Sequence, residues 1–97
     1  MNKEIIEAIF NQNTIEIVYE NEIAIVEPYC YGITATGNEG LIAYQIKSQL
    51  PKALKGWRIF ELDKADDINI LTTTFTIIRE HTKIGYIEMD IVYAQVY

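Results

Sequence analysis

From Thr14 onward, the apolar residues of this chain fall in short runs, the first of which has an apolar residue at every second position. In the first such run, Ile15, Ile17 and Tyr19 would point to one side of an extended chain and the intervening residues to the other. The runs are rich in β-branched and aromatic residues, and Gly, Asn and Pro separate them. This pattern favours an antiparallel sheet of short strands that are joined mostly by tight turns.

Five strands are predicted before residue 76. They cover residues 14–19, 23–26, 41–47, 57–62 and 68–72, and the chain continues past Pro28 through Tyr29 to Thr34. Because Pro28 has no amide donor, it is expected at an edge, bulge or bend. Turns are expected at 20–22 and 36–40, the longest loop at 48–56, and one helical turn at 63–67. Such short strands favour a small curled sheet or barrel, since closure removes exposed edges.

A short helix is predicted ahead of the sheet, over residues 3–11. Asn2 is of a residue type that caps helices, because its side-chain oxygen accepts hydrogen bonds from the first free amides. Four apolar residues then follow at helical spacing: Ile5, Ile6, Ile9 and Phe10.

The C-terminal residues 84–97 are rich in Ile, Val and Tyr, which favours a strand. A helix is the alternative, because Ile87, Ile91 and Ala94 also suit helical spacing. We predict the strand. A chain of 97 residues with no repeat or linker suits one domain. Its expected parts are the helix at 3–11, a barrel at 14–75 and a C-terminal extension at 76–97.

The charge of the chain changes sign near its middle. Overall, 14 acidic and 8 basic residues give a net charge of −6, which disfavours nucleic-acid binding over the whole surface. Five of the basic residues, however, fall within residues 47–64, together with the only tryptophan, Trp57. An anionic or planar ligand would bind most readily to such a basic, aromatic patch. The alternative is that these side chains only solvate a loop.

Residue types that carry catalysis or bind metals are scarce. One cysteine and one histidine, Cys30 and His81, cannot supply a zinc ligand set, and they are the sole candidates for a thiol–imidazole pair. Asp63, Asp66 and Asp67 lack the ligand pattern and the glycine of a calcium loop. We therefore expect no enzyme activity, no catalytic residue, no metal and no cofactor.

The single cysteine also bears on location. Cys30 cannot form an internal disulfide, which fits a reducing compartment, and we expect a cytoplasmic protein. No apolar run approaches the ~20 residues that span a bilayer, and residues 1–4 lack the pattern of a signal peptide. No membrane partner is predicted.

Over residues 14–75 the chain resembles the WYL domain. The resemblance is carried by Ile15-x-Ile17-x-Tyr19, Val26-Glu27-Pro28, Gly37-Asn38 before Leu41-x-Ala43-Tyr44, and Arg58-x-Phe60-x-Leu62-Asp63-Lys64. It implies an Sm-like, SH3-type β-barrel that senses a ligand, often a nucleotide or nucleic acid, in bacterial transcription regulators. With no winged helix in these 97 residues, a stand-alone module is expected, or one that works with another chain.

Parts of the family pattern are replaced in this chain. Glu39-Gly40 stands where the family has Trp-Tyr, and Ala24 and Glu61 stand where arginines are usual. The residues that match include Tyr44 and Arg58. Losing two arginines weakens an interaction with nucleic acid, because each phosphate contact adds to affinity.

Eight residues are candidates for ligand binding: Tyr44, Gln45, Lys47, Lys52, Lys55, Trp57, Arg58 and Lys64. A guanidinium such as that of Arg58 can bind a phosphate or carboxylate through two hydrogen bonds, or it can form a surface ion pair with Asp63 or Glu61. Trp57 can stack on a base or fill the core.

The patch and the resemblance predict a non-enzymatic regulatory module that senses an anionic, nucleotide-like ligand. One alternative is a barrel that binds single-stranded nucleic acid. The other is a module for protein interaction or self-assembly, in which the apolar residues 91–97 extend the sheet of a partner.

Overall fold

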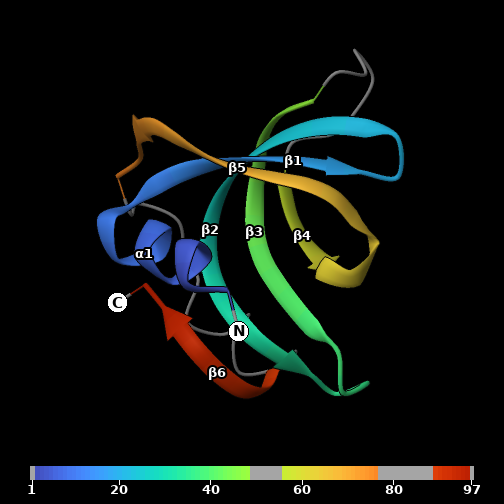
Figure 1. Cartoon of the computed structure of the whole chain (residues 1–97). Coiled ribbons are helices and arrows are strands. Elements are labelled where there is room, and N and C mark those ends of the chain that lie inside the picture. Colours follow the sequence, from blue (N-terminus) through green and yellow to red (C-terminus); the bar gives the residue numbers. More distant parts are fainter. Residues whose placement is uncertain (1, 49–55, 77–88, 97) are drawn as a thin grey trace.

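A computed structural model describes residues 2–48, 56–76 and 89–96 (Figure 1). Most of the loop predicted at 48–56 lies outside these residues, as do the candidates Lys52 and Lys55 and the histidine His81. The elements in chain order are α1 (Lys3–Asn11), β1 (Asn13–Tyr19), β2 (Glu22–Thr34), β3 (Glu39–Ser48), β4 (Gly56–Glu61), the 3-10 helix η1 (Leu62–Lys64), β5 (Ala65–Thr74) and β6 (Met89–Gln95).

The strands form one antiparallel sheet in the order β4-β3-β2-β1-β5, with β6 also paired to β2. Strands β4 and β5 therefore lie at opposite ends of this path, yet they are joined directly through η1. Figure 1 shows how the sheet curls to bring these ends toward each other, with α1 beside β2 and β1. The expected mainly β fold is confirmed: the chain forms a small antiparallel, barrel-like sheet with a short N-terminal helix and a C-terminal strand.

Strand β2 is the centre of the fold, because three strands pair with it. Along one edge it pairs with β3, and along the other it pairs first with β1, through residues 22–26, and then with β6, through residues 30–34. Pro28 falls between these two pairings, so its missing amide donor leaves no gap in the ladders with β1 and β6. As expected, the register against β3 is irregular here, between Pro28 and Cys30.

Two details at the end of the barrel differ from the sequence-based expectation. The helical turn predicted at 63–67 is the 3-10 helix Leu62–Lys64, and β5 begins at Ala65 and not at residue 68. Asp66 and Asp67 suit a turn in sequence, but Asp67 pairs with Val18 of β1. A strand can carry these acids because their side chains are exposed.

Helix α1 begins and ends as its sequence predicts. The Asn2 side chain accepts hydrogen bonds from the backbone amides of Glu4 and Ile5, and Gln12 ends the helix in the left-handed conformation. Ile5, Ala8 and Ile9 are buried, but Phe10 is 65% exposed. The sequence pattern predicts Phe10 on the apolar face of the helix. Because Phe10 directly follows Ile9, its side chain is rotated by about 100° around the helix axis and lies outside the buried face.

One main cluster of buried residues forms most of the core. The largest fully buried side chains are Tyr29, Tyr31 and Phe60, and aliphatic residues of β1, β2, β3 and α1 pack with them. A smaller cluster of Cys30, Ile42 and Met89 lies apart from it. Among the residues that the structure describes, no helix is long and apolar enough to cross a membrane.

Candidate functional site

The predicted ligand-binding patch is divided between the two faces of the β3–β4 ladder. Tyr44 pairs with Trp57, and Ala43 pairs with Arg58. Successive side chains of a strand point to opposite faces, so Tyr44 and Trp57 share one face while Arg58 lies on the other. Trp57 and Arg58 thus lie on opposite faces, as strand alternation predicts, whereas the prediction that Tyr44 and Arg58 share one surface is wrong. The two faces of the ladder therefore present different sets of side chains.

On the inner face, Arg58 is held by an amide and two aromatic rings. Its Nη1 atom donates a hydrogen bond to Gln45 Oε1 over 2.6 Å. Its guanidinium carbon lies 4.7 Å from the centroid of the Phe60 ring and 5.7 Å from that of Tyr19. Within the part of the chain that the structure describes, no carboxylate lies within ion-pair distance of Arg58. The alternative, a surface pair with Asp63 or Glu61, is not what the structure shows.

On the other face, Trp57 packs edge-on against two tyrosines. The ring centroid of Trp57 lies 4.7 Å from that of Tyr29 and 5.4 Å from that of Tyr44. Tyr29 is buried, and its hydroxyl donates a 3.2 Å hydrogen bond to the buried carboxylate of Glu27. Trp57 thus serves at least in part as a packing residue.

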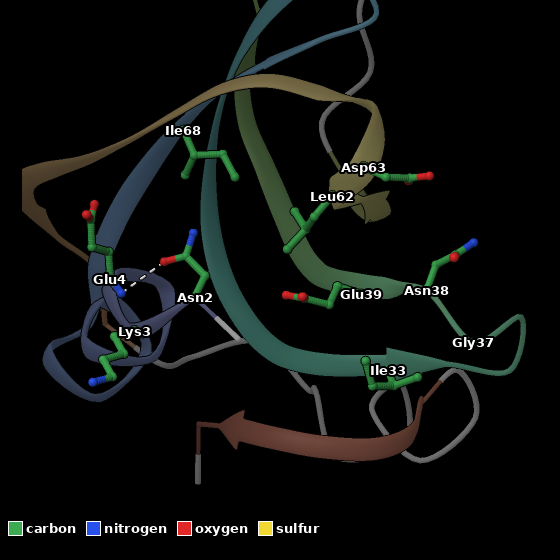
Figure 2. A pocket seen from close by; sticks show the side chains of 10 residues that line it. All are labelled: Asn2, Lys3, Glu4, Ile33, Gly37, Asn38, Glu39, Leu62, Asp63 and Ile68. Carbon is green, nitrogen blue, oxygen red and sulfur yellow. Dashed lines mark hydrogen bonds between the residues drawn. The ribbon is translucent and has the colours of Figure 1, made fainter.

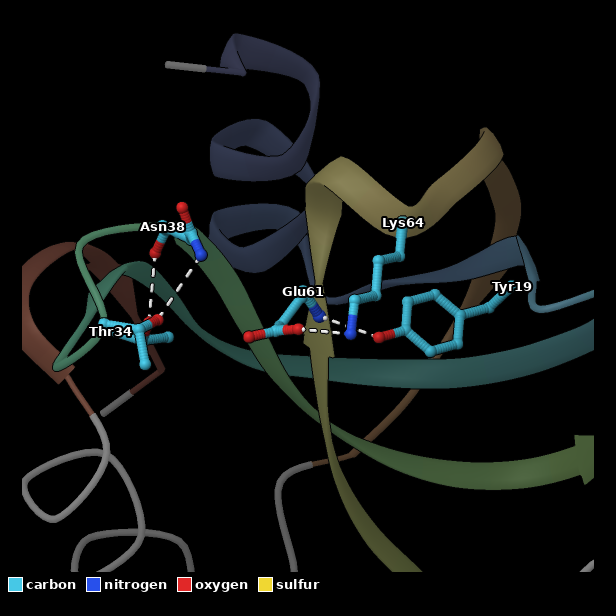
Figure 3. A network of polar contacts seen from close by, with 6 residues as sticks. Tyr19, Thr34, Asn38, Glu61 and Lys64 are labelled. Carbon is cyan, nitrogen blue, oxygen red and sulfur yellow. Dashed lines mark hydrogen bonds and ion pairs between the residues drawn. The ribbon is translucent and has the colours of Figure 1, made fainter.

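The two described lysines of the patch lie at separate places. Lys47 is near the end of β3. Lys64 forms a 2.9 Å ion pair with Glu61, whose backbone amide donates to the hydroxyl of Tyr19 (Figure 3). The hydrogen bond and the charge of Glu61 raise the pKa of the Lys64 ammonium group. Of the eight predicted residues, the structure brings Gln45 together with Arg58, and Tyr44 together with Trp57.

A cavity that the sequence analysis missed lies near the start of α1, between the β2–β3 turn and η1 (Figure 2). Its volume is about 820 Å³, within the range of ligand sites. The lining residues are Asn2, Lys3, Glu4, Ile33, Gly37, Asn38, Glu39, Leu62, Asp63 and Ile68. They come from separate parts of the chain, so no local motif marks the cavity. Glu39, which stands where the WYL pattern has a tryptophan, is a sequence signal at this cavity.

Tyr31 fixes the carboxylate of this cavity. Its hydroxyl donates a hydrogen bond to Glu39 Oε1 and accepts one of 2.6 Å from the backbone amide of Asn2. Burial, followed by the hydrogen bond to Glu39, raises the pKa of Tyr31 to about 12. The phenol therefore keeps its proton at neutral pH and remains a donor to Glu39.

The residues considered for catalysis and metal binding are placed as follows. Cys30 is buried, and burial raises the pKa of its thiol to about 11, so it suits a packing role better than that of a nucleophile. No group of three or more His, Cys, Asp or Glu residues that could hold a metal ion occurs among the described residues.

Comparison with protein-family models, with curated proteins and with solved structures gives no match to this chain. Its function must therefore be inferred from the fold and the geometry of its side chains, and the resemblance to the WYL domain stays a prediction.

Proposed function

We propose that this protein is a non-enzymatic binding module that holds an anionic group of a small ligand, such as the phosphate of a nucleotide, at Arg58. The observation that carries the proposal is a guanidinium with defined orientation and no carboxylate partner among the described residues. Gln45 and the Phe60 ring position this group, and its remaining N–H donors match the oxygens of a phosphate.

The surroundings of Arg58 support a role in binding. A guanidinium that is half-buried against two rings has lost part of its hydration, so an anion that reaches it gains more than at a fully exposed site. A regulatory, WYL-like role in a bacterial cytoplasm is part of this proposal. The sequence motifs support that part, together with the free thiol of Cys30.

The proposal is tested with an Arg58→Gln variant, which removes the charge and keeps a polar side chain of moderate length. In calorimetric titrations with nucleoside monophosphates and with inorganic phosphate, affinity should fall by about tenfold or more, because the variant loses a hydrogen bond between two charged groups. Arg58→Lys should recover only part of the loss, because an ammonium group cannot bind two oxygens in the same fork geometry.

Lys64→Gln is the matched control, because it makes the same change in net charge at a lysine that is paired with Glu61. It should change affinity much less than Arg58→Gln does. Equal losses in the two variants would mean that general charge, and not Arg58, attracts the anion. Unchanged affinity in Arg58→Gln would remove the assignment altogether.

A protein-interaction role is the second candidate, and one observation favours it. Strand β6 exposes three consecutive apolar side chains, Ile91, Val92 and Tyr93. Exposed apolar strand residues are a common basis of association between sheets. Light scattering of the full chain separates the two candidates, since a monomer at high concentration would count against self-assembly.

A further inference from the structure

Gln45 is a polar side chain at a buried position of β3. Leu41 and Ala43, the preceding residues on the same face of the strand, are 0% exposed, and Gln45 is 2% exposed. Burying an amide is unfavourable unless its polar atoms find partners. The side-chain oxygen has such a partner, because it accepts a hydrogen bond from Arg58. This bond explains one half of the amide and leaves the nitrogen to be explained.

The bond to Arg58 decides which way the amide of Gln45 faces. A guanidinium carries only donors, so the amide must turn its oxygen toward Arg58 and its Nε2 atom away. Among the described residues, Nε2 donates no hydrogen bond. It is not sealed in the core either, since no fully buried side-chain nitrogen or oxygen in this part of the chain lacks a partner. Gln45 thus keeps a donor that solvent can reach, one amide group away from the guanidinium.

The strand position opposite this donor is open. Gly56 of β4 pairs with Gln45, and a Cβ atom built on Gly56 would meet no atom within 4 Å. Because Gly56 and Arg58 are two residues apart on β4, such an atom would lie on the face that carries Arg58. Since residue 56 has no side chain to cover the amide, a small ligand group has room beside Gln45 and Arg58.

We propose that Gln45 makes the anion site of Arg58 selective for the terminal phosphate of a monoester over a carboxylate. This selectivity rests on the proposed function, an anion held at Arg58, and adds a second contact to it. The two oxygens of a carboxylate are satisfied by the donors that Arg58 has left, because a guanidinium binds such a pair in a fork. A phosphate monoester has a third terminal oxygen, and Nε2 of Gln45 donates a hydrogen bond to it.

A comparison of methyl phosphate with acetate tests this selectivity. Both anions are titrated calorimetrically into the original full chain and into Gln45→Met, which keeps the length of the side chain and removes its polar atoms. The affinity for methyl phosphate should fall about tenfold more than the affinity for acetate, because only the phosphate loses the hydrogen bond from Nε2. If Gln45 does no more than hold Arg58 in place, both affinities fall by the same factor, and the proposal is overturned.

Two further variants separate this selectivity from the proposed function. Arg58→Gln should weaken the binding of both anions. If it does not, or if the original chain binds neither anion, the anion site itself is wrong and its selectivity falls with it. Gln95→Met makes the same chemical change on β6, which β2 and β3 separate from β4, and should bind both anions like the original chain. An equal loss of selectivity in this control would show that the effect does not come from Gln45.

The side-chain amide signals of Gln45 give a measurement that does not depend on the folding of a variant. In the ¹⁵N-labelled original chain, methyl phosphate should shift the signals of the Nε2 protons in a saturable way, because these protons contact its third oxygen. Acetate should shift them much less. If the signals stay unchanged at a methyl phosphate concentration that saturates the calorimetric titration, the contact with Gln45 is wrong.

Discussion

A single tyrosine hydroxyl joins three elements of this protein. Tyr31 of β2 hydrogen-bonds to Glu39 of β3 and to the backbone of Asn2, where α1 begins. Because the Tyr31 side chain is buried and both bonds are partly buried, water competes with them less than it would on the open surface. Tyr31 therefore couples the position of α1 to the shape of the cavity.

The buried phenol and the buried thiol of Cys30 predict that the protein loses stability at alkaline pH. Burial raises the pKa of Cys30 from 9.0 to about 11 and that of Tyr31 from 10.0 to about 12. At a pH between the unfolded and folded pKa values of either group, the unfolded chain has released the proton of that group and the folded chain still retains it. A rise in pH through this range therefore favours unfolding. These two groups should leave the free energy of unfolding in urea unchanged below pH 9.0 and lower it from there to about pH 12.

A Tyr31→Phe variant isolates the part of this effect that comes from the phenol. Another group, Lys64, also has a raised pKa, and its stabilising pair with Glu61 is likewise lost as the pH rises. The variant should therefore still lose stability, but less steeply above pH 10.0. A profile parallel to that of the original chain in this range would show that Tyr31 does not contribute.

At the scale of elements, the approach of β6 to β2 depends on Gly32. A Cβ atom at this position would lie 1.8 Å from the carbonyl oxygen of Ile91, which is far closer than any contact between real atoms. Gly32 pairs with Val92 of β6 and also with Gly40 of β3. Strand β6 can lie along β2 because this residue has no side chain.

We therefore predict that Gly32→Ala displaces β6. The free energy of unfolding should fall by about 1–3 kcal/mol, the usual cost of overpacking. Hydrogen exchange should localise the change: the amide of Val96, which donates to the Tyr29 carbonyl, should lose protection, while the amides between β1 and β5 keep theirs.

Gly37→Ala is the matched control for this prediction. Gly37 has a φ of 86°, and a Cβ atom added there would meet no other atom within 4 Å, so its replacement costs only backbone strain. A loss of about 1 kcal/mol is expected, with unchanged exchange in β6. If the amides of β6 are as well protected from hydrogen exchange in Gly32→Ala as in Gly37→Ala, the close packing of β6 on β2 is incorrect.

At the scale of the whole molecule, the curled sheet separates chemistry that is adjacent in sequence. Trp57 and Arg58 are neighbours in the chain, yet one packs with Tyr29 and Tyr44 and the other points to the inner face with Gln45. The two faces of a strand in a curled sheet face different environments. A ligand held at Arg58 therefore does not need Trp57.

This separation predicts the effect of Trp57→Phe on anion binding. Because the two residues do not share a face, phosphate affinity should change by about twofold or less, as for independent sites. Titration calorimetry measures it, after circular dichroism has shown that the variant is folded. A loss as large as that in Arg58→Gln would show that one ligand contacts both faces.

Much of the architecture could be predicted because its signals are local. The hairpin between β1 and β2 follows from Glu20 and Asn21, which adopt positive φ values of 50° and 66° between two alternating runs. The cap at Asn2, the irregularity at Pro28 and the strand within residues 84–97 were likewise expected from the residues themselves. The start of β5 at Ala65 could not be predicted, because pairing with β1 outweighs the turn preference of the aspartates.

The sequence by itself determined where the chain extends, where it turns and that it closes into a small barrel, because alternation and turn chemistry act between near neighbours. Only the tertiary structure decided which side chains meet. It separated Tyr44 from Arg58 by one step of strand alternation, and it brought Asn2, Glu39 and Leu62 around one cavity. Such encounters depend on the register and curvature of the whole sheet, which no short segment of sequence specifies.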